Sequence, residues 1–276
     1  MERIDSHQHF WNYDPTRHSW MNNEMEELKK DYAPKDLKVL LDECQIQGSI
    51  AVQASQTEAE NEFLLELAGK YSFIQGIVGW VDLQSISISE RLSYYHTKNK
   101  IKGFRHVIHD EPDINFMLRA AFLQGIKALH SFGYVYDLLV FPIHLPNAFS
   151  LAKQFPDQPF VIDHIAKPNI LGNEIAEWRK SLMPLASLPN VYCKISGMVT
   201  EAVWKKWKQE DFIPYLDTIV ELFGTKRILY GSDWPVCTLS ASYAETYGIV
   251  KKYFYSFSRD EQKDFFGLNA RRIYQL

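Results

Sequence analysis

Two histidines separated by one residue lie near the start of the chain, in the segment Ile4-Asp5-Ser6-His7-Gln8-His9. The segment is typical of a short strand, and in a strand the side chains of residues i and i+2 point to the same face. His7 and His9 would therefore aim two imidazoles at one point, which suits a divalent metal ion or a charged reacting group. A lone His-x-His pair is equally compatible with a structural role, so the interpretation depends on partners elsewhere in the chain.

Asp233 is the candidate partner, in the segment Tyr230-Gly231-Ser232-Asp233-Trp234-Pro235 near the other end of the chain. A carboxylate can ligate a metal ion and can carry a proton to and from water. Asp233 could instead cap the helix that follows, because Asp is favoured at helix N-caps.

The elements that must position these residues follow an alternating pattern. Short runs rich in β-branched and aromatic residues are each followed by a longer amphipathic stretch, which predicts a parallel sheet covered by helices. The predicted strands are Glu2–His9, Ser49–Ala54, Ile74–Val81, Ile101–Val107, Tyr134–Val140, Phe160–His164, Val191–Ser196 and Arg227–Ser232. The predicted helices are Pro34–Gln45, Glu58–Lys70, Ser87–Lys98, Ile114–Phe132, Asn147–Phe155, Glu174–Leu188, Phe212–Phe223, Tyr243–Ser256 and Arg259–Tyr274.

Eight strand–helix units in 276 residues predict a (β/α)8 TIM barrel, a single domain over residues 1–276, since such barrels usually have about 250 residues. An open doubly wound sheet is the alternative, but the sequence has neither G-x-G-x-x-G nor a G-x-x-x-x-G-K-[ST] phosphate loop. The segment Trp11–Tyr32 is long for a βα loop. We predict that residues 11–33 form a flap over the barrel mouth; a surface Ω-loop packed by its own aromatic residues is the equal alternative.

Polar residues occur at nearly every predicted strand end, which is the end that carries the active site in this fold. Each has a structural explanation when taken alone: Arg105 and Lys194 could pair with carboxylates, and Gln53 and Trp80 could be ordinary lining residues. Their convergence on one end favours a functional site, because burying them unpaired would be costly. The residues are His7, His9, Gln53, Trp80, Asp82, Arg105, His106, His109, Asp137, Asp163, His164, Lys167, Lys194, Ser196 and Asp233.

Several of these segments resemble the amidohydrolase superfamily, and within it the amidohydrolase-2 group that contains sugar-lactone hydrolases of the L-fuconolactonase and L-rhamnonolactonase type. The resemblance runs from the first predicted strand to the last. The matching segments are Asp5-Ser6-His7-Gln8-His9-Phe10-Trp11, Gly103-Phe104-Arg105-His106, Asp110-Glu111-Pro112-Asp113, Asp163-His164-Ile165-Ala166-Lys167-Pro168, Lys194-Ile195-Ser196-Gly197 and Tyr230-Gly231-Ser232-Asp233-Trp234-Pro235.

The resemblance implies at most one divalent metal ion, with zinc the first choice, held by His7, His9, His164 and Asp233 or a subset of them. Binuclear amidohydrolases carry a carbamylated lysine after the fourth strand, where this chain has Arg105. Some members of the group work without a tightly held metal, so the ion could be dispensable. The implied catalytic residues are Asp233, His164 and Arg105.

A small sugar (aldono) lactone is the substrate that the polar residues favour, bound by Gln53, Trp80, Arg105, His106 and Lys194. The alternative reaction is decarboxylation of an unsaturated or aromatic acid by a metal-dependent enzyme. A third possibility, which is not an enzyme, is a non-catalytic sugar-acid-binding protein. Such a protein would not need Asp233 beside three histidines. A dicarboxylate lactone would call for more than one arginine at the mouth.

Composition excludes several partners. The formal net charge is −4 with no Lys/Arg-rich run, so a nucleic acid is not expected. The most apolar stretch, Leu138–Leu145, contains Pro142 and His144 and is too short to span a membrane. The odd count of three scattered cysteines and the lack of a signal-peptide pattern predict a cytoplasmic protein. The sequence leaves a homo-oligomer open.

Overall fold

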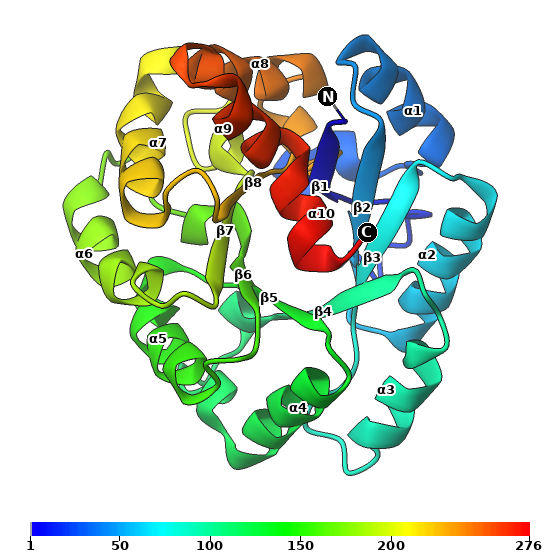
Figure 1. Ribbon diagram of the computed structural model, residues 1–276. Helices are drawn as coiled ribbons and strands as arrows, with labels where there is room; N and C mark the ends of the chain where they lie inside the picture. Colours follow the sequence, from blue (N-terminus) through cyan, green and yellow to red (C-terminus); the bar gives the residue numbers. More distant parts are fainter. Residues whose placement is uncertain (1) are drawn as a thin grey trace.

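A computed structural model describes residues 2–276, and its centre is an eight-stranded parallel sheet in which each strand pairs with the next along the chain (Figure 1). The strands are β1 (Ile4–Gln8), β2 (Gly48–Val52), β3 (Ile74–Gly79), β4 (Ile101–Val107), β5 (Val135–Leu139), β6 (Phe160–Ile162), β7 (Val191–Ile195) and β8 (Ile228–Tyr230). The segment after β8 returns to β1. The His9 N–H donates to the Trp234 carbonyl at 2.7 Å, and the Asp233 N–H donates to the His7 carbonyl at 2.8 Å. These bonds close the sheet into a barrel.

Helices surround the barrel and alternate with its strands (Figure 1). The outer helices are α1 (Pro34–Glu43), α2 (Glu58–Lys70), α3 (Ile88–His96), α4 (Ala120–Ser131), α5 (Leu145–Gln154), α6 (Ile175–Ala186), α7 (Gln209–Phe223) and α8 (Tyr243–Tyr253). Short 3-10 turns occupy the loops: η1 (Asn23–Leu28), η2 (Ile108–Asp110), η3 (Phe116–Leu118), η4 (Pro142–His144), η5 (Asp163–Ala166), η6 (Met198–Thr200), η7 (Val236–Leu239) and η8 (Phe254–Ser256). The chain ends with α9 (Arg259–Lys263), a π turn η9 (Asp264–Leu268) and α10 (Asn269–Tyr274).

The predicted (β/α)8 barrel is confirmed, and the doubly wound alternative is wrong because the sheet closes on itself. The start of α9 has the capping box that its sequence is typical of. Ser258 caps α9, since its hydroxyl accepts from the Glu261 N–H at 3.3 Å and the Glu261 carboxylate accepts from the Ser258 N–H at 2.9 Å. The predicted helix Arg259–Tyr274 is divided by the π turn, which places α10 across the barrel axis (Figure 1).

The barrel interior is apolar near the end where the strands begin. Inward-facing residues of the strands pack there against Ala270, Ile273 and Tyr274 of α10. The strand residues of this cluster are Ile4, Ile50, Val52, Val78, Val135, Val161 and Leu229. A separate, larger core fills the layer between the strands and the outer helices. With α10 covering this end, the barrel is open to ligands at the other end.

The segment between β1 and α1 folds back on itself. Trp11 and Tyr32 form an isolated antiparallel bridge, and the segment between them contains η1. The Trp11 indole N–H donates to the Lys30 carbonyl at 2.9 Å, and the ring is 1% exposed. The ends of this segment are therefore tied together beside the end of β1.

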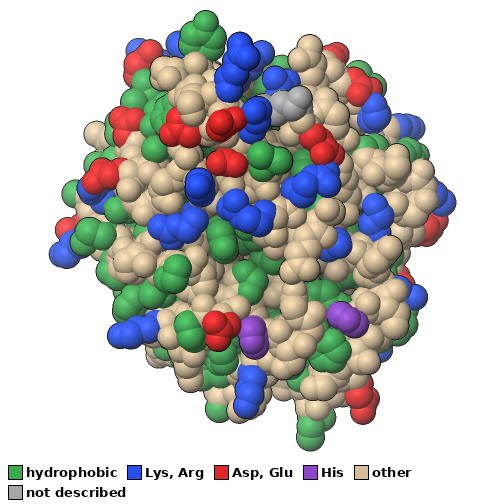
Figure 2. Space-filling view, viewed as in Figure 1, with side chains coloured by type: hydrophobic (Ala, Val, Ile, Leu, Met, Phe, Trp, Pro, Cys, Tyr) green, Lys and Arg blue, Asp and Glu red, His purple; other side chains and the backbone are tan. Residues whose placement is uncertain are grey.

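On the face drawn in Figure 2, several basic side chains lie across the middle, with acidic side chains above and around them. Among residues 2–276, no helix combines the length and the apolar character needed to cross a membrane.

Candidate active site

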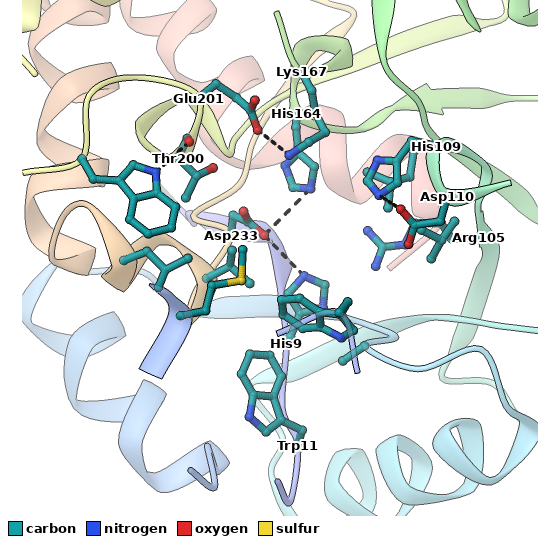
Figure 3. A pocket seen from close by; sticks show the side chains of 18 residues that line it. His9, Trp11, Arg105, His109, Asp110, His164, Lys167, Thr200, Glu201 and Asp233 are labelled. Atoms are coloured by element: carbon teal, nitrogen blue, oxygen red, sulfur yellow. Dashed lines mark hydrogen bonds and ion pairs between the residues drawn. The ribbon is translucent and has the colours of Figure 1, made fainter. Parts of the chain in front are cut away.

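A cavity of about 330 Å³ lies at the end of the barrel where the strands end (Figure 3). Four buried polar side chains line it: His9, Arg105, His164 and Asp233. The rest of the wall is of mixed character. Its apolar members include Trp11, Trp20, Met25, Trp204, Val236 and Leu239, and its polar members include His109, Asp110, Lys167, Thr200 and Glu201.

Asp233 is the point on which the site converges (Figure 3). Its Oδ1 lies 3.4 Å from Nε2 of His9, 3.8 Å from Nε2 of His7 and 3.9 Å from Nε2 of His164. The Asp233 backbone has φ 59°, the left-handed region that non-glycine residues rarely occupy. Its N–H is bonded to the His7 carbonyl, so β1 holds this strained residue in place.

The three imidazoles are oriented by groups outside the cavity that contact their Nδ1 atoms. Nδ1 of His9 lies 2.8 Å from the Val52 carbonyl oxygen, to which it must donate. Nδ1 of His7 lies 3.2 Å from Oδ1 of Asp163, and Nδ1 of His164 lies 2.9 Å from the Ser196 hydroxyl. Each Nε2 is thereby left to face Asp233.

Unusual backbone brings His164 to this point. His164, Ile165, Ala166 and Lys167 have φ values of 53°, 49°, 60° and 48°, a left-handed turn made without glycine. Each such residue costs roughly 1–2 kcal/mol, so the surrounding contacts must hold the turn. The Trp178 indole N–H donates to the Ile165 carbonyl at 2.9 Å from behind the turn.

Gly197 makes room for the His164 ring. Its φ is 63°, and a Cβ added there would lie 2.6 Å from Nδ1 of His164. Both the backbone angle and the close approach therefore require glycine at the end of β7.

Burial sets the protonation of the site. It lowers the pKa of His7 well below its ordinary value and lowers that of His164 to about 4, so both rings are neutral at neutral pH. Burial alone would raise the pKa of Asp233. The interactions of Asp233 with the neighbouring His164 and His9 rings outweigh burial, so the pKa of Asp233 is lowered and Asp233 is ionised.

A buried ion-pair network lies beneath the site. Asp163 is its centre, with Oδ2 3.0 Å from Nη1 of Arg105 and Oδ1 3.1 Å from Nζ of Lys194. Lys194 also lies 2.5 Å from Oδ2 of Asp137, whose Oδ1 accepts from the Tyr274 hydroxyl at 2.7 Å. Burial opposes the charge on Asp163, but Lys194 and His7 hold its pKa well below the usual range. The network thus connects α10 to the first histidine.

The donor set fits a divalent metal ion. His7, His164 and Asp233 each offer one ligand atom, and these atoms lie within 4.8 Å of one another. Nε2 of His9 is 3.2 Å from Nε2 of His7. The His9 Nδ1 donates to the Val52 carbonyl, so the Nε2 lone pair of a neutral His9 is free to ligate a cation beside Nε2 of His7.

Of the five residues predicted to bind substrate, four do not line the cavity: Gln53, Trp80, His106 and Lys194. Lys194 and Gln53 are fully buried; the Gln53 Nε2 faces the Arg105 carbonyl at 3.4 Å. The Trp80 indole N–H donates to Nδ1 of His106 at 3.2 Å, and Nε2 of His106 lies 2.6 Å from Glu111. These four residues surround the site, whereas Arg105 lines the cavity itself.

Other cavity residues had little or no signal in the sequence. His109 and Lys167 stood among the polar strand-end residues without an assigned role. Glu201 and Trp204 lie on the loop after β7, where no motif points to them.

The amidohydrolase family model matches residues 4–276. The chain belongs to the amidohydrolase family.

Two relatives of this family are instructive. The chain is 39% identical to an L-fucono-1,5-lactonase of Burkholderia multivorans, over 99% of this chain and 96% of that protein. It is 25% identical to an L-rhamnono-gamma-lactonase of Scheffersomyces stipitis, over 70% of this chain and 66% of that protein.

A solved amidohydrolase structure is also very similar. It comes from Burkholderia multivorans with bound zinc and superposes with a TM-score of 0.96 at 39% identity, over all of both chains.

Proposed function

We propose that this amidohydrolase opens the ester bond of a small sugar (aldono) lactone with water. The observation that carries the proposal is the convergence of three imidazole Nε2 atoms and an ionised Asp233 at a cavity of about 330 Å³. That volume is at the small end of the ~300–1,000 Å³ range of small-molecule sites. The similarity to an L-fucono-1,5-lactonase over nearly the whole chain supports the same class of substrate.

We propose that His7, His9, His164 and Asp233 hold one divalent ion, zinc being the first choice because nitrogen and carboxylate donors suit it. When bound, the metal supplies Lewis-acid polarisation of the lactone carbonyl and of water. The bound zinc in the Burkholderia multivorans amidohydrolase supports this choice.

Asp233 is the proposed proton carrier. As a carboxylate it accepts a proton from the attacking water while the water oxygen bonds to the lactone carbonyl carbon. The C–O bond to the ring oxygen then breaks, and Asp233 returns the proton to the leaving alkoxide. The product is a single hydroxy acid that contains all the atoms of the lactone and of one water molecule.

Arg105 is proposed to stabilise the oxyanion that forms on the carbonyl oxygen, whereas His164 contributes as one of the proposed metal ligands. Both line the cavity, and Nε of Arg105 is buried with no hydrogen-bond partner in the described part of the chain. An unpaired donor costs free energy in the ground state, so a developing negative charge beside it is favoured.

We propose that the predicted substrate-binding residues outside the cavity support the residues that line it. Gln53 and His106 flank the chain segment around Arg105, and Trp80 orients His106. Lys194 neutralises Asp137 and Asp163. We propose that direct contacts to the lactone hydroxyls come from polar residues at the edge of the cavity such as His109.

We also propose that residues 11–33 cover the cavity, since Trp11, Trp20 and Met25 contribute to its wall. A cytoplasmic location is proposed from the three unpaired cysteines, which suit a reducing compartment.

The test is a panel of aldonolactones assayed with a pH indicator, using zinc-loaded protein, chelator-treated protein and the Asp233→Asn variant. Acid release above the spontaneous rate by the zinc-loaded wild type alone supports the proposal. Binding without turnover on every lactone would instead identify a sugar-acid-binding protein. Release of CO2 from aromatic acids with no lactone turnover would identify a decarboxylase.

A further inference from the structure

Lys167 and Glu201 form an ion pair between two hollows of the surface. Both residues line the candidate active-site cavity, and both line a neighbouring groove of about 500 Å³. Nζ of Lys167 lies 2.5 Å from Oε1 of Glu201, and the side chains are 18% and 20% exposed. Figure 3 shows the pair beside His164, at the edge of the site.

We propose that this ion pair is a specificity-determining wall that limits the substrate to a lactone with a single sugar ring. The inference rests on the proposed lactonase function and adds the feature that sets the size of the substrate. Without the wall, the cavity and the groove would form one continuous space.

A second contact continues the same wall. The ring of His109, on the cavity side, stacks on the ring of Phe141, on the groove side, with centroids 4.6 Å apart. The ion pair and this stack together separate the two hollows. Of the two contacts, the ion pair can be truncated without removing a cavity-lining imidazole.

The groove has the chemistry to hold a second sugar ring once the wall is open. Phe141 and Ile143 offer apolar surface, being 37% and 71% exposed. Asn169 and Glu174 add amide and carboxylate groups that can bond to hydroxyls. Apolar surface with a few convergent polar groups is the usual composition of a small-molecule site.

The loops that carry the pair are held by bonds that do not depend on it. The Leu171 N–H donates to the Glu201 carbonyl at 2.9 Å, which joins the loop after β6 to the loop after β7. The Lys167 N–H donates to the His164 carbonyl at 2.8 Å, and Trp178 holds Ile165 from behind. Truncating both side chains should therefore leave an opening rather than collapse the loops.

The test compares one-ring and two-ring lactones. The substrates are an aldono-1,5-lactone and an aldonolactone that carries a second sugar ring through a glycosidic bond. The Lys167→Ala/Glu201→Ala variant removes both charges together, so neither is left unpaired. We expect the ratio of kcat/KM for the two-ring lactone to that for the one-ring lactone to rise about tenfold or more, the scale of pocket-size discrimination.

Two further variants serve as controls: one keeps the bulk of the pair without its charges, and the other removes a different ion pair. Lys167→Met/Glu201→Gln removes both charges but keeps side chains of nearly the same length, and it should keep the wild-type ratio. Arg179→Ala/Glu221→Ala removes an exposed 2.6 Å ion pair between α6 and α7 whose residues line neither hollow, and this variant should also keep the wild-type ratio. Circular dichroism melting of all three variants checks that they are folded.

An unchanged ratio in the double alanine variant would overturn the wall, as would an equal rise in the Met/Gln variant. Efficient turnover of the two-ring lactone by the wild type would overturn it too. If the wild type turns over neither lactone, the proposed function fails instead. The wall is then tested by calorimetric binding of the one-ring and two-ring aldonates to the same variants. The double alanine variant should strengthen binding of the two-ring aldonate relative to the one-ring aldonate by about tenfold or more, and the two control variants should not.

Discussion

Replacing Lys194 by Met tests whether this lysine supports the fold or binds substrate. In the structure its ammonium group faces Asp137 at 2.5 Å and Asp163 at 3.1 Å, and all three side chains are fully buried. Without Lys194, Asp163 keeps Arg105 at 3.0 Å, whereas Asp137 keeps only the neutral Tyr274 hydroxyl. One buried carboxylate then lacks a charge partner, which costs about 3–5 kcal/mol of unfolding free energy.

The cost should depend on pH. Burial raises the pKa of Asp137 from 3.8 to about 6 even beside Lys194, and removing the lysine raises it further. A carboxyl whose folded pKa exceeds its unfolded value loses stability as pH rises through the folded pKa. The deficit of Lys194→Met relative to wild type should therefore be larger at pH 8 than at pH 5.

The assay is urea unfolding at both pH values, followed by circular dichroism. The double variant Lys194→Met/Asp137→Asn should recover most of the deficit, because no unpaired charge remains. Lys38→Met, which breaks an exposed pair with Asp42, is the matched control and should cost at most about 1 kcal/mol. A Lys194→Met deficit no larger than the control, with a raised KM for the lactone, would refute the reasoning and return Lys194 to the substrate site.

Three further outcomes are expected. Asp233→Asn should reduce kcat by about 10²–10⁴-fold with an unchanged circular dichroism spectrum, because it removes a proton carrier and keeps the side-chain shape; activity near wild type would exclude Asp233 as the base. Chelation followed by dialysis should lower both activity and melting temperature, and added zinc should restore both in the wild type and only weakly in His9→Ala, as measured by zinc analysis and differential scanning calorimetry. Gly197→Ala should lower both stability and kcat, because its Cβ would lie 2.6 Å from Nδ1 of His164 at φ 63°; a variant with wild-type kcat and melting temperature would contradict the close approach.

The order of elements and the ligand strands could be predicted from the sequence because they depend on local patterns. Alternating β-branched runs and amphipathic stretches mark each unit of the barrel, and the His-x-His spacing fixes two side chains on one strand face. The strand-end rule then brings Asp233 to the same place.

The role of each polar strand-end residue could not be predicted in the same way. Whether a side chain points into the cavity or into the barrel depends on the strand register, and Lys194 points to the buried carboxylates. Glu201 reaches the cavity from a loop, where spacing carries no periodic signal. The left-handed turn after β6 contains no glycine, the residue that usually indicates such a turn, so the turn could not be predicted from its sequence.

The hydrogen bonds that close the barrel have a practical consequence. The His7 carbonyl and the Asp233 N–H form one of them, so the seam between the first and the last strand runs through the proposed ligands themselves. Asp5 reinforces this seam by accepting from the Ser232 N–H at 2.9 Å and from the Tyr243 hydroxyl at 3.0 Å. A local opening of the seam would separate His7 from Asp233 without requiring the outer helices to melt. Catalytic activity is thus a sensitive reporter of barrel closure, and storage or immobilisation conditions are better judged by turnover than by helix content.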